Sequence, residues 1–260
     1  MHEMPQIPRV REHIARIQKL ALEKPYIETG WPCFAAVPFL AQVFGENLRL
    51  VHIVRHPVKA ALSMQTHGYY QGREDAGSKL GQLTPFDPGV VQSHYAKSWE
   101  QMTPYEKCLF HWTEINLYAE ELFRAYPNVP QLRIPSEDLF SAECSGLKKL
   151  LEFLSLPLRP EIVAFAQTRV DRFRLKTSLN VDWEAVFRHP ETVALSERLG
   201  YRFDGLDTRA LRSRYAETVL GRLKRVYRER RRAARALIKA KFSAHVRKLP
   251  LALDSAKSDR

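Results

Sequence analysis

Two periodicities of apolar residues divide the chain into expected strands and helices. A near-continuous, β-branched apolar run at residues 48–54 is typical of a strand covered on both faces, and a shorter run at residues 131–134 predicts a second strand. Between them, residues 103–123 predict an amphipathic helix, because Thr103 and Glu106 form a capping box around a proline at the first helical position. The order of strands and helices predicts an α/β fold.

The end of the first strand carries residues suited to binding phosphate. Arg55 follows the apolar run, and Pro57 forces a turn into a helix that starts at Val58. The rise of this helix is expected to bring Ser63 near Arg55, so that a guanidinium and a hydroxyl can meet one anionic group. The alternative is an ordinary strand-to-helix turn whose arginine is merely solvated.

Further segments complete the expected order of elements. Residues 26–29 predict a short strand, residues 34–44 a helix, and residues 147–156 another helix. Residues 69–91 contain four glycines and two prolines without a clear period, which predicts a long loop. Loops of this length often act as lids or bind substrate, so we expect substrate specificity to lie here.

The segment around Arg55 resembles the 3′-phosphate-binding motif of the sulfotransferases, in which an apolar strand precedes Arg, any residue, Pro and a later Ser. Arg55, Pro57 and Ser63 occupy these positions, while His56 stands where the family commonly has Asp. The resemblance implies that Arg55 and Ser63 hold the 3′-phosphate of the sulfate donor 3′-phosphoadenosine 5′-phosphosulfate (PAPS). It also implies the family's P-loop-NTPase-like fold, with three layers and a mostly parallel sheet between helices.

The resemblance covers residues 25–160 and, more loosely, residues 191–201. It includes a helix that ends in Phe-Leu-Ser-Leu, where Ser155 replaces the family's usual glycine. The family's first strand, glycine-rich loop and helix, which hold the 5′-phosphosulfate, have no counterpart, because residues 1–25 contain no glycine. Either the chain is a shortened copy of the family, or another segment replaces the loop.

Two further residues are candidates through the resemblance. Glu28 lies where cytosolic sulfotransferases have a catalytic Lys-Thr-His segment, so it is the candidate base, although Gly30 occupies the histidine position. The alternative is a capping or salt-bridged carboxylate. Lys176, in a late basic cluster, is a candidate for a second contact to the 3′-phosphate, or else ordinary surface charge.

Three histidines lie close to the motif. His52 falls within the strand, where a core residue with satisfied hydrogen bonds is favoured over a base. His56 and His67 flank the motif and are minor candidates for ligand contact. The nine histidines of the chain show no metal-ligand spacing, and we expect no metal.

Positive charge is concentrated near the carboxy terminus. Residues 208–248 contain 15 Lys and Arg against two acidic residues, a net charge of +13, whereas the remainder carries −1. An apolar stripe at helical spacing runs through this segment and predicts a docked helix with a cationic continuation; its residues are Leu211, Tyr215, Val219, Leu223, Val226 and Tyr227. The continuation is either simply solvated or meets an anionic membrane, a nucleic acid or a sulfated glycan.

These patterns predict three regions: a sulfotransferase-like α/β domain at residues 1–206, a basic helical extension at 207–249 and a disordered tail at 250–260. Three scattered cysteines favour a reducing, cytoplasmic location, while a luminal, membrane-anchored origin stays open. The expected function is transfer of a sulfuryl group from PAPS to a hydroxyl or amine of a carbohydrate or small-molecule acceptor. The alternatives are a catalytically incomplete relative that binds nucleotides or polyanions, and a membrane or nucleic-acid protein that acts through its basic tail.

Overall fold

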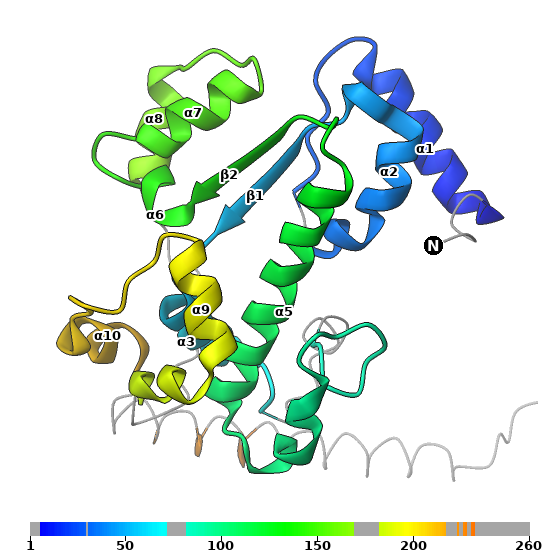
Figure 1. The fold of residues 1–260 in the computed structure, drawn as a ribbon. Coiled ribbons are helices and arrows are strands. Elements are labelled where there is room, and N and C mark those ends of the chain that lie inside the picture. The colour runs from blue at the N-terminus through cyan, green and yellow to red at the C-terminus, as the bar shows by residue number, and fades with distance from the viewer. Residues whose placement is uncertain are drawn as a thin grey trace, which may run out of the picture.

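The computed structural model describes residues 6–29, 31–71, 82–168 and 182–216, together with five helical positions between 223 and 231. The structure is α/β, with helices dominating and a small parallel sheet (Figure 1). The α-helices are α1 (Pro8–Ala21), α2 (Val37–Phe44), α3 (Pro57–Thr66), α5 (Pro104–Ala125), α6 (Ser136–Leu139), α7 (Ser145–Phe153), α8 (Pro160–Gln167), α9 (Pro190–Arg198) and α10 (Thr208–Tyr215). Short 3-10 helices are η2 (Trp31–Ala36), η3 (Gly45–Asn47), η4 (Ser93–Lys97), η5 (Trp99–Gln101) and η6 (Trp183–Arg188).

The sheet of the described residues has two strands, β1 (Leu50–Val54) and β2 (Gln131–Pro135). They run parallel, with Leu50 opposite Gln131 and Val54 opposite Pro135. Both strands therefore end at the same edge of the sheet, where β1 leads into α3 and β2 leads into α6 (Figure 1).

Helices lie against both faces of β2. Arg133 points toward α5, because its guanidinium lies 3.8 Å from Glu120 and over the ring of Phe123. Its neighbour Ile134 points to the opposite face and is buried, on the side where α7 packs against β2. On β1, however, Ile53 is 51% exposed, so the expectation that this strand is covered on both faces is wrong.

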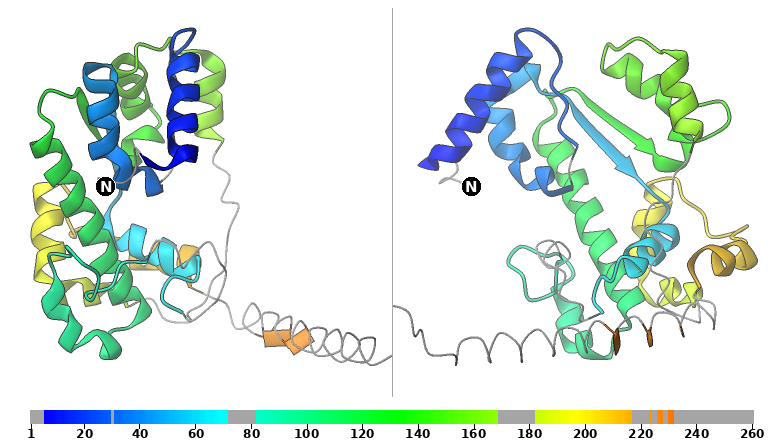
Figure 2. Two further views of the ribbon diagram at one scale, coloured as in Figure 1. Left: turned by 90° about the vertical axis from the view of Figure 1, so that its right-hand side faces the viewer. Right: turned by 180° about the vertical axis from the view of Figure 1, so that it is seen from behind.

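The core beside the sheet edge joins helices that are distant in sequence. Buried residues of α3, α5, η6 and α10 form one cluster, whose members are Val58, Ala61, Leu62, Tyr105, Cys108, Leu109, Ala185, Val186, Leu211 and Tyr215. Figure 2 shows α10 beside α3, at the end of the sheet to which β1 points. A second cluster packs the last residue of β1 against α5 and α9 through Val54, Trp112, Leu195 and Leu199.

Two local predictions are confirmed in detail. Thr103 caps α5 by accepting the Glu106 amide, and the Glu106 carboxylate accepts the Thr103 amide in return, so the capping box forms as expected. Ser155 has φ 56°, in the left-handed region that glycine favours. The bonds from the Leu156 amide to the Leu151 carbonyl and from the Ser155 amide to the Glu152 carbonyl close α7 in a Schellman motif. Ser155 thus adopts the conformation expected of the glycine that it replaces.

Other predictions are corrected. Residues 26–29 are not a strand, since Tyr26 and Ile27 are exposed and no described strand pairs with them. The helix expected at residues 34–44 is divided into η2 and α2. The strand expected from residue 48 begins at Leu50.

The prediction of a docked apolar stripe near the carboxy terminus is confirmed only for its first two residues. Leu211 and Tyr215 are buried as expected, but α10 ends at Tyr215, because Ala216 has an extended backbone with ψ 140°. Leu223 and Tyr227 are 63% and 66% exposed, so the expectation that they continue the docked stripe is wrong. No helix of the described residues is long and apolar enough to cross a membrane.

Candidate anion-binding site

Three side-chain contacts fix the backbone where β1 turns into α3. The Tyr201 hydroxyl donates to the Val54 carbonyl at 2.9 Å, and the Trp112 indole N–H donates to the Arg55 carbonyl at 3.0 Å. The His56 amide donates to the Glu137 carboxylate at 3.3 Å. These donors and acceptors come from α5, α6 and the segment after α9, so the position of Arg55 is set by much of the fold.

The Arg55 side chain is half-buried and has a defined partner. Its Nη2 donates to the hydroxyl of Tyr215, the last residue of α10, at 2.9 Å. A guanidinium has five N–H donors in a planar fork, so this bond leaves donors for an anion. The amino terminus of α3 adds partial positive charge beside it.

His56 is the N-cap of α3. Its Nδ1 accepts the Val58 amide at 3.2 Å, and its Nε2 donates to the Arg202 carbonyl at 3.0 Å. Burial lowers the pKa of His56, which favours the neutral imidazole that this arrangement needs. The histidine therefore provides a capping acceptor where the sulfotransferases commonly have Asp, and both ring nitrogens are engaged within the protein.

Ser63 lies on α3 about 9 Å along the helix axis from Pro57, from a rise of about 1.5 Å per residue. No hydrogen bond joins its hydroxyl to Arg55 among the described residues. Lys59 precedes Ser63 by one helical turn and shares its face of α3, since residues four apart are neighbours on a helix. Its ammonium group adds a second cation to the motif; Lys59 is not among the residues predicted above, although its four-residue spacing from Ser63 indicates a shared face.

Glu137 brings a carboxylate close to these cations. Besides the His56 amide it accepts the hydroxyls of Tyr201 and Ser136, both at 3.1 Å, and lies 4.0 Å from the Lys59 ammonium. Burial, followed by the charge of Glu137, raises the pKa of Tyr201, which keeps this hydroxyl protonated as a donor. The carboxylate is thus satisfied by protein donors.

The other candidates are not brought to this site. Glu28 is exposed and accepts the Tyr26 hydroxyl at 2.7 Å, a bond that raises the pKa of Tyr26. No contact within the described residues links Glu28 to Arg55 or Ser63. Lys176 lies outside the described residues.

The remaining histidines differ in role. His52 donates from Nε2 to Asn116 at 2.9 Å and accepts the Arg133 Nε at Nδ1 at 3.3 Å, which agrees with a satisfied core residue rather than a base. His67 ends α3, where its amide donates to the Met64 carbonyl at 2.9 Å. No cluster of three or more His, Cys, Asp or Glu side chains that could hold a metal occurs in the described ranges.

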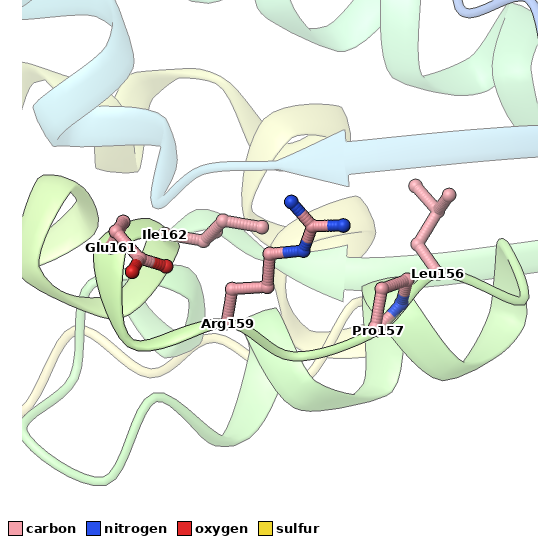
Figure 3. A pocket seen from close by; sticks show the side chains of 5 residues that line it. All are labelled: Leu156, Pro157, Arg159, Glu161 and Ile162. Carbon is pink, nitrogen blue, oxygen red and sulfur yellow. The ribbon is translucent and has the colours of Figure 1, made fainter.

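A pocket of about 420 Å³ lies at the connection between α7 and α8 (Figure 3). Leu156, Pro157 and Ile162 give it apolar walls, and Arg159 and Glu161 add opposite charges. In Figure 3 the side chains of Leu156 and Arg159 extend toward the strands, while Glu161 points another way. None of the residues expected from the sequence to bind the donor lines this pocket.

Two contacts of the Arg55 site could not be foreseen from the motif. The sequence places Trp112 within the helix predicted at residues 103–123 and Tyr215 on the apolar stripe of the basic segment, and neither pattern links them to Arg55. Trp112 and Tyr215 lie 57 and 160 residues from Arg55 in sequence. No local pattern signals such pairing.

Comparison with known proteins gives one structural likeness. Neither a protein-family model nor a curated protein sequence matches the chain. The solved structure of a sulfotransferase domain from the curacin biosynthetic pathway is similar over 74% of this chain and 68% of its own, with 14% identity and a TM-score of 0.44. At this level the likeness carries no argument about function, which has to come from the site itself.

Proposed function

We propose that this chain is a sulfotransferase-like protein that binds PAPS through its 3′-phosphate and transfers the sulfuryl group to a hydroxyl or amine. The acceptor is a carbohydrate or another small molecule. The observation that carries the proposal is the half-buried Arg55, whose guanidinium is fixed at the start of α3 by Tyr215 with donors to spare. Arginine in this position suits a phosphate dianion, since its fork binds two oxygens together.

The residues of the site fit the 3′-phosphate half of the donor. Arg55 would donate from its remaining N–H groups, while Ser63 and Lys59, both half-buried, would approach from α3. Ser63 does not reach the Arg55 guanidinium, so the phosphate itself would bridge the two groups. Lys176 is proposed as a further contact.

For the 5′-phosphosulfate half we assign no residues, and no step of the transfer is derived through it. When PAPS is bound, transfer forms an S–O bond to a hydroxyl acceptor or an S–N bond to an amine, breaks the S–O bond to the 5′-phosphate and releases the acceptor proton to a base. Glu28 is proposed as that base, and the loop at residues 69–91 as the acceptor-binding segment. We propose that β1 and β2 correspond to two strands of the three-layer, mostly parallel sheet of the sulfotransferases.

A second candidate is a catalytically incomplete relative that binds the nucleotide without transferring sulfate. One observation favours it: Glu28, the proposed base, has no described contact with the Arg55 site. The basic extension is proposed, in either case, to meet an anionic surface.

The test is calorimetric titration with adenosine 3′,5′-bisphosphate, the desulfonated donor. We expect the wild type to bind and Arg55→Ala to lose binding. Arg49→Ala is the matched control, because Arg49 precedes the same strand but, among the described residues, hydrogen-bonds to Phe153 and Ser155 at the end of α7 and not to the Arg55 site. Absence of binding in the wild type, or equal loss in both variants, would refute the proposal.

Transfer is tested separately with sulfur-labelled PAPS and a panel of sugars and phenols. Labelled product that depends on Arg55 would establish the enzyme. Binding of the bisphosphate without product from any acceptor would favour the non-catalytic relative.

A further inference from the structure

The carboxy-terminal helix α10 reaches the anion site through a single hydroxyl. Tyr215 is the last residue of α10, is 7% exposed, and accepts a hydrogen bond from Arg55 Nη2 at 2.9 Å. The contact joins the first residue after β1 to a segment 160 residues later.

Tyr215 is held in place from both ends of α10. The helix starts at an N-cap, Asp207, whose carboxylate accepts the amides of Arg209 and Ala210 at 2.8 and 3.0 Å. The Trp183 indole N–H then donates to the Thr208 hydroxyl at 3.1 Å. At the other end, Tyr215 packs in the buried cluster that includes Val58, Ala61 and Leu62 of α3.

Hydrogen-bond chemistry assigns the direction of the contact with Arg55. A guanidinium only donates, so the oxygen of Tyr215 accepts and its own O–H proton remains to be donated. Within the described part of the chain, no acceptor for that proton is found. A nearly buried hydroxyl beside a cation, whose proton has no acceptor among the described residues, is suited to donate to an anion.

Further positive charge surrounds the same tyrosine. The guanidinium of Arg214 lies over the Tyr215 ring, 5.6 Å from its centre. Arg55 and Arg214 therefore place two cations around one side chain. This arrangement raises the local attraction for an anion, and the Tyr215 hydroxyl is the neutral donor beside Arg55.

We propose that Tyr215 is itself a ligand of the anion held by Arg55. Its oxygen accepts from Arg55 and orients the guanidinium, while its O–H donates to an oxygen of the bound phosphate. The basic carboxy-terminal segment then contributes a residue to the site rather than a separate surface alone. This inference rests on the proposed function in taking the 3′-phosphate of the nucleotide as the anion.

The matched variants are Tyr215→Phe and Tyr105→Phe. Tyr105 belongs to the same buried cluster, is 5% exposed, and donates its hydroxyl to the Trp183 carbonyl at 3.2 Å without contacting Arg55. Both changes remove one buried hydroxyl and keep the ring. They therefore separate a role in anion binding from a role in packing.

Calorimetry with adenosine 3′,5′-bisphosphate should show about tenfold or greater weakening for Tyr215→Phe, the scale of a lost hydrogen bond to a charged group. Tyr105→Phe should stay within about twofold of the wild type. Adenosine 5′-monophosphate, which lacks the 3′-phosphate, should bind the wild type and Tyr215→Phe equally, if at all.

A second arm makes the inference independent of the nucleotide. The melting temperature of the same variants is measured with and without inorganic phosphate, and we expect Tyr215→Phe to lose most of the stabilisation. Nucleotide binding that needs Arg55 but is unchanged in Tyr215→Phe would overturn this inference and leave the proposed function standing. If inorganic phosphate stabilises the protein through Tyr215 but no nucleotide binds, the inference about Tyr215 stands and the proposed function is overturned. A wild type that responds to neither phosphate nor nucleotide overturns the inference and the proposed function together.

Discussion

His111 on α5 should make the protein unfold more easily as the pH falls from 7.5 to 5. Its ring is 5% exposed, and its Nδ1 accepts the Leu83 amide at 3.3 Å. Burial lowers the pKa of His111 from 6.5 to about 4, since the charged imidazolium loses its hydration inside the protein. The folded state therefore favours the neutral ring.

The sign and size of the change in the free energy of unfolding follow from this shift in the pKa of His111. Because the folded pKa lies below the unfolded one, the unfolded chain binds the proton first, and stability is complete above pH 6.5 and declines as the pH falls toward 4. The free energy of unfolding should decrease by about 2 kcal/mol at pH 5 and about 3 kcal/mol at pH 4 from this residue.

The assay is urea unfolding at pH 7.5, 6.5, 5.5 and 5 for the wild type and His111→Asn. The asparagine oxygen can take the place of Nδ1 as acceptor for the Leu83 amide but does not titrate, so the variant removes the proton site. Burial also lowers the pKa of His52, His56 and His189, so both proteins lose some stability in acid. The difference between them isolates His111, and parallel pH profiles would refute the argument.

Three further substitutions test the frame around the Arg55 site. Gly146→Ala should reduce the free energy of unfolding by about 1–3 kcal/mol, because a Cβ at Gly146 would lie 2.7 Å from the Asp138 carbonyl carbon; an unchanged urea midpoint would contradict this close packing. Thr103→Ala removes the cap of α5 and should lower stability by about 1 kcal/mol while bisphosphate affinity, measured by calorimetry, stays the same; a change in affinity would contradict the separation of the two sites. Trp112→Phe should weaken bisphosphate binding, because the Arg55 carbonyl loses its indole donor; full affinity by calorimetry would show that this bond does not position Arg55.

Local patterns in the sequence predicted those features whose causes are local. The capping box at Thr103 and the turn at Pro57 depend on residues within a few positions of each other, and the structure confirms both. Ser155 also adopts the left-handed backbone conformation expected of the glycine that it replaces. The end of α7 requires this conformation, because the chain changes direction there.

The failures concern contacts between distant segments. Residues 26–29 have the composition of a strand but lack a neighbouring strand among the described residues, and a strand exists only through its partner. The apolar spacing continues past Ala216, but the backbone leaves the helical conformation at that residue. Periodicity in the sequence does not indicate such a break. For the same reason no pattern in the sequence indicates that Tyr215 contacts Arg55.

The hydrogen bond between Arg55 and Tyr215 also determines when the Arg55 site can be completed during folding. During synthesis Arg55 leaves the ribosome 160 residues before Tyr215, so a nascent chain carries the arginine without the hydroxyl that orients it. The turn into α3 can begin to form early, because Pro57 and the capping residue His56 are next to it in the sequence, whereas the guanidinium acquires its final geometry only after α10 has docked. Anion affinity would thus develop last, as a property of the finished chain.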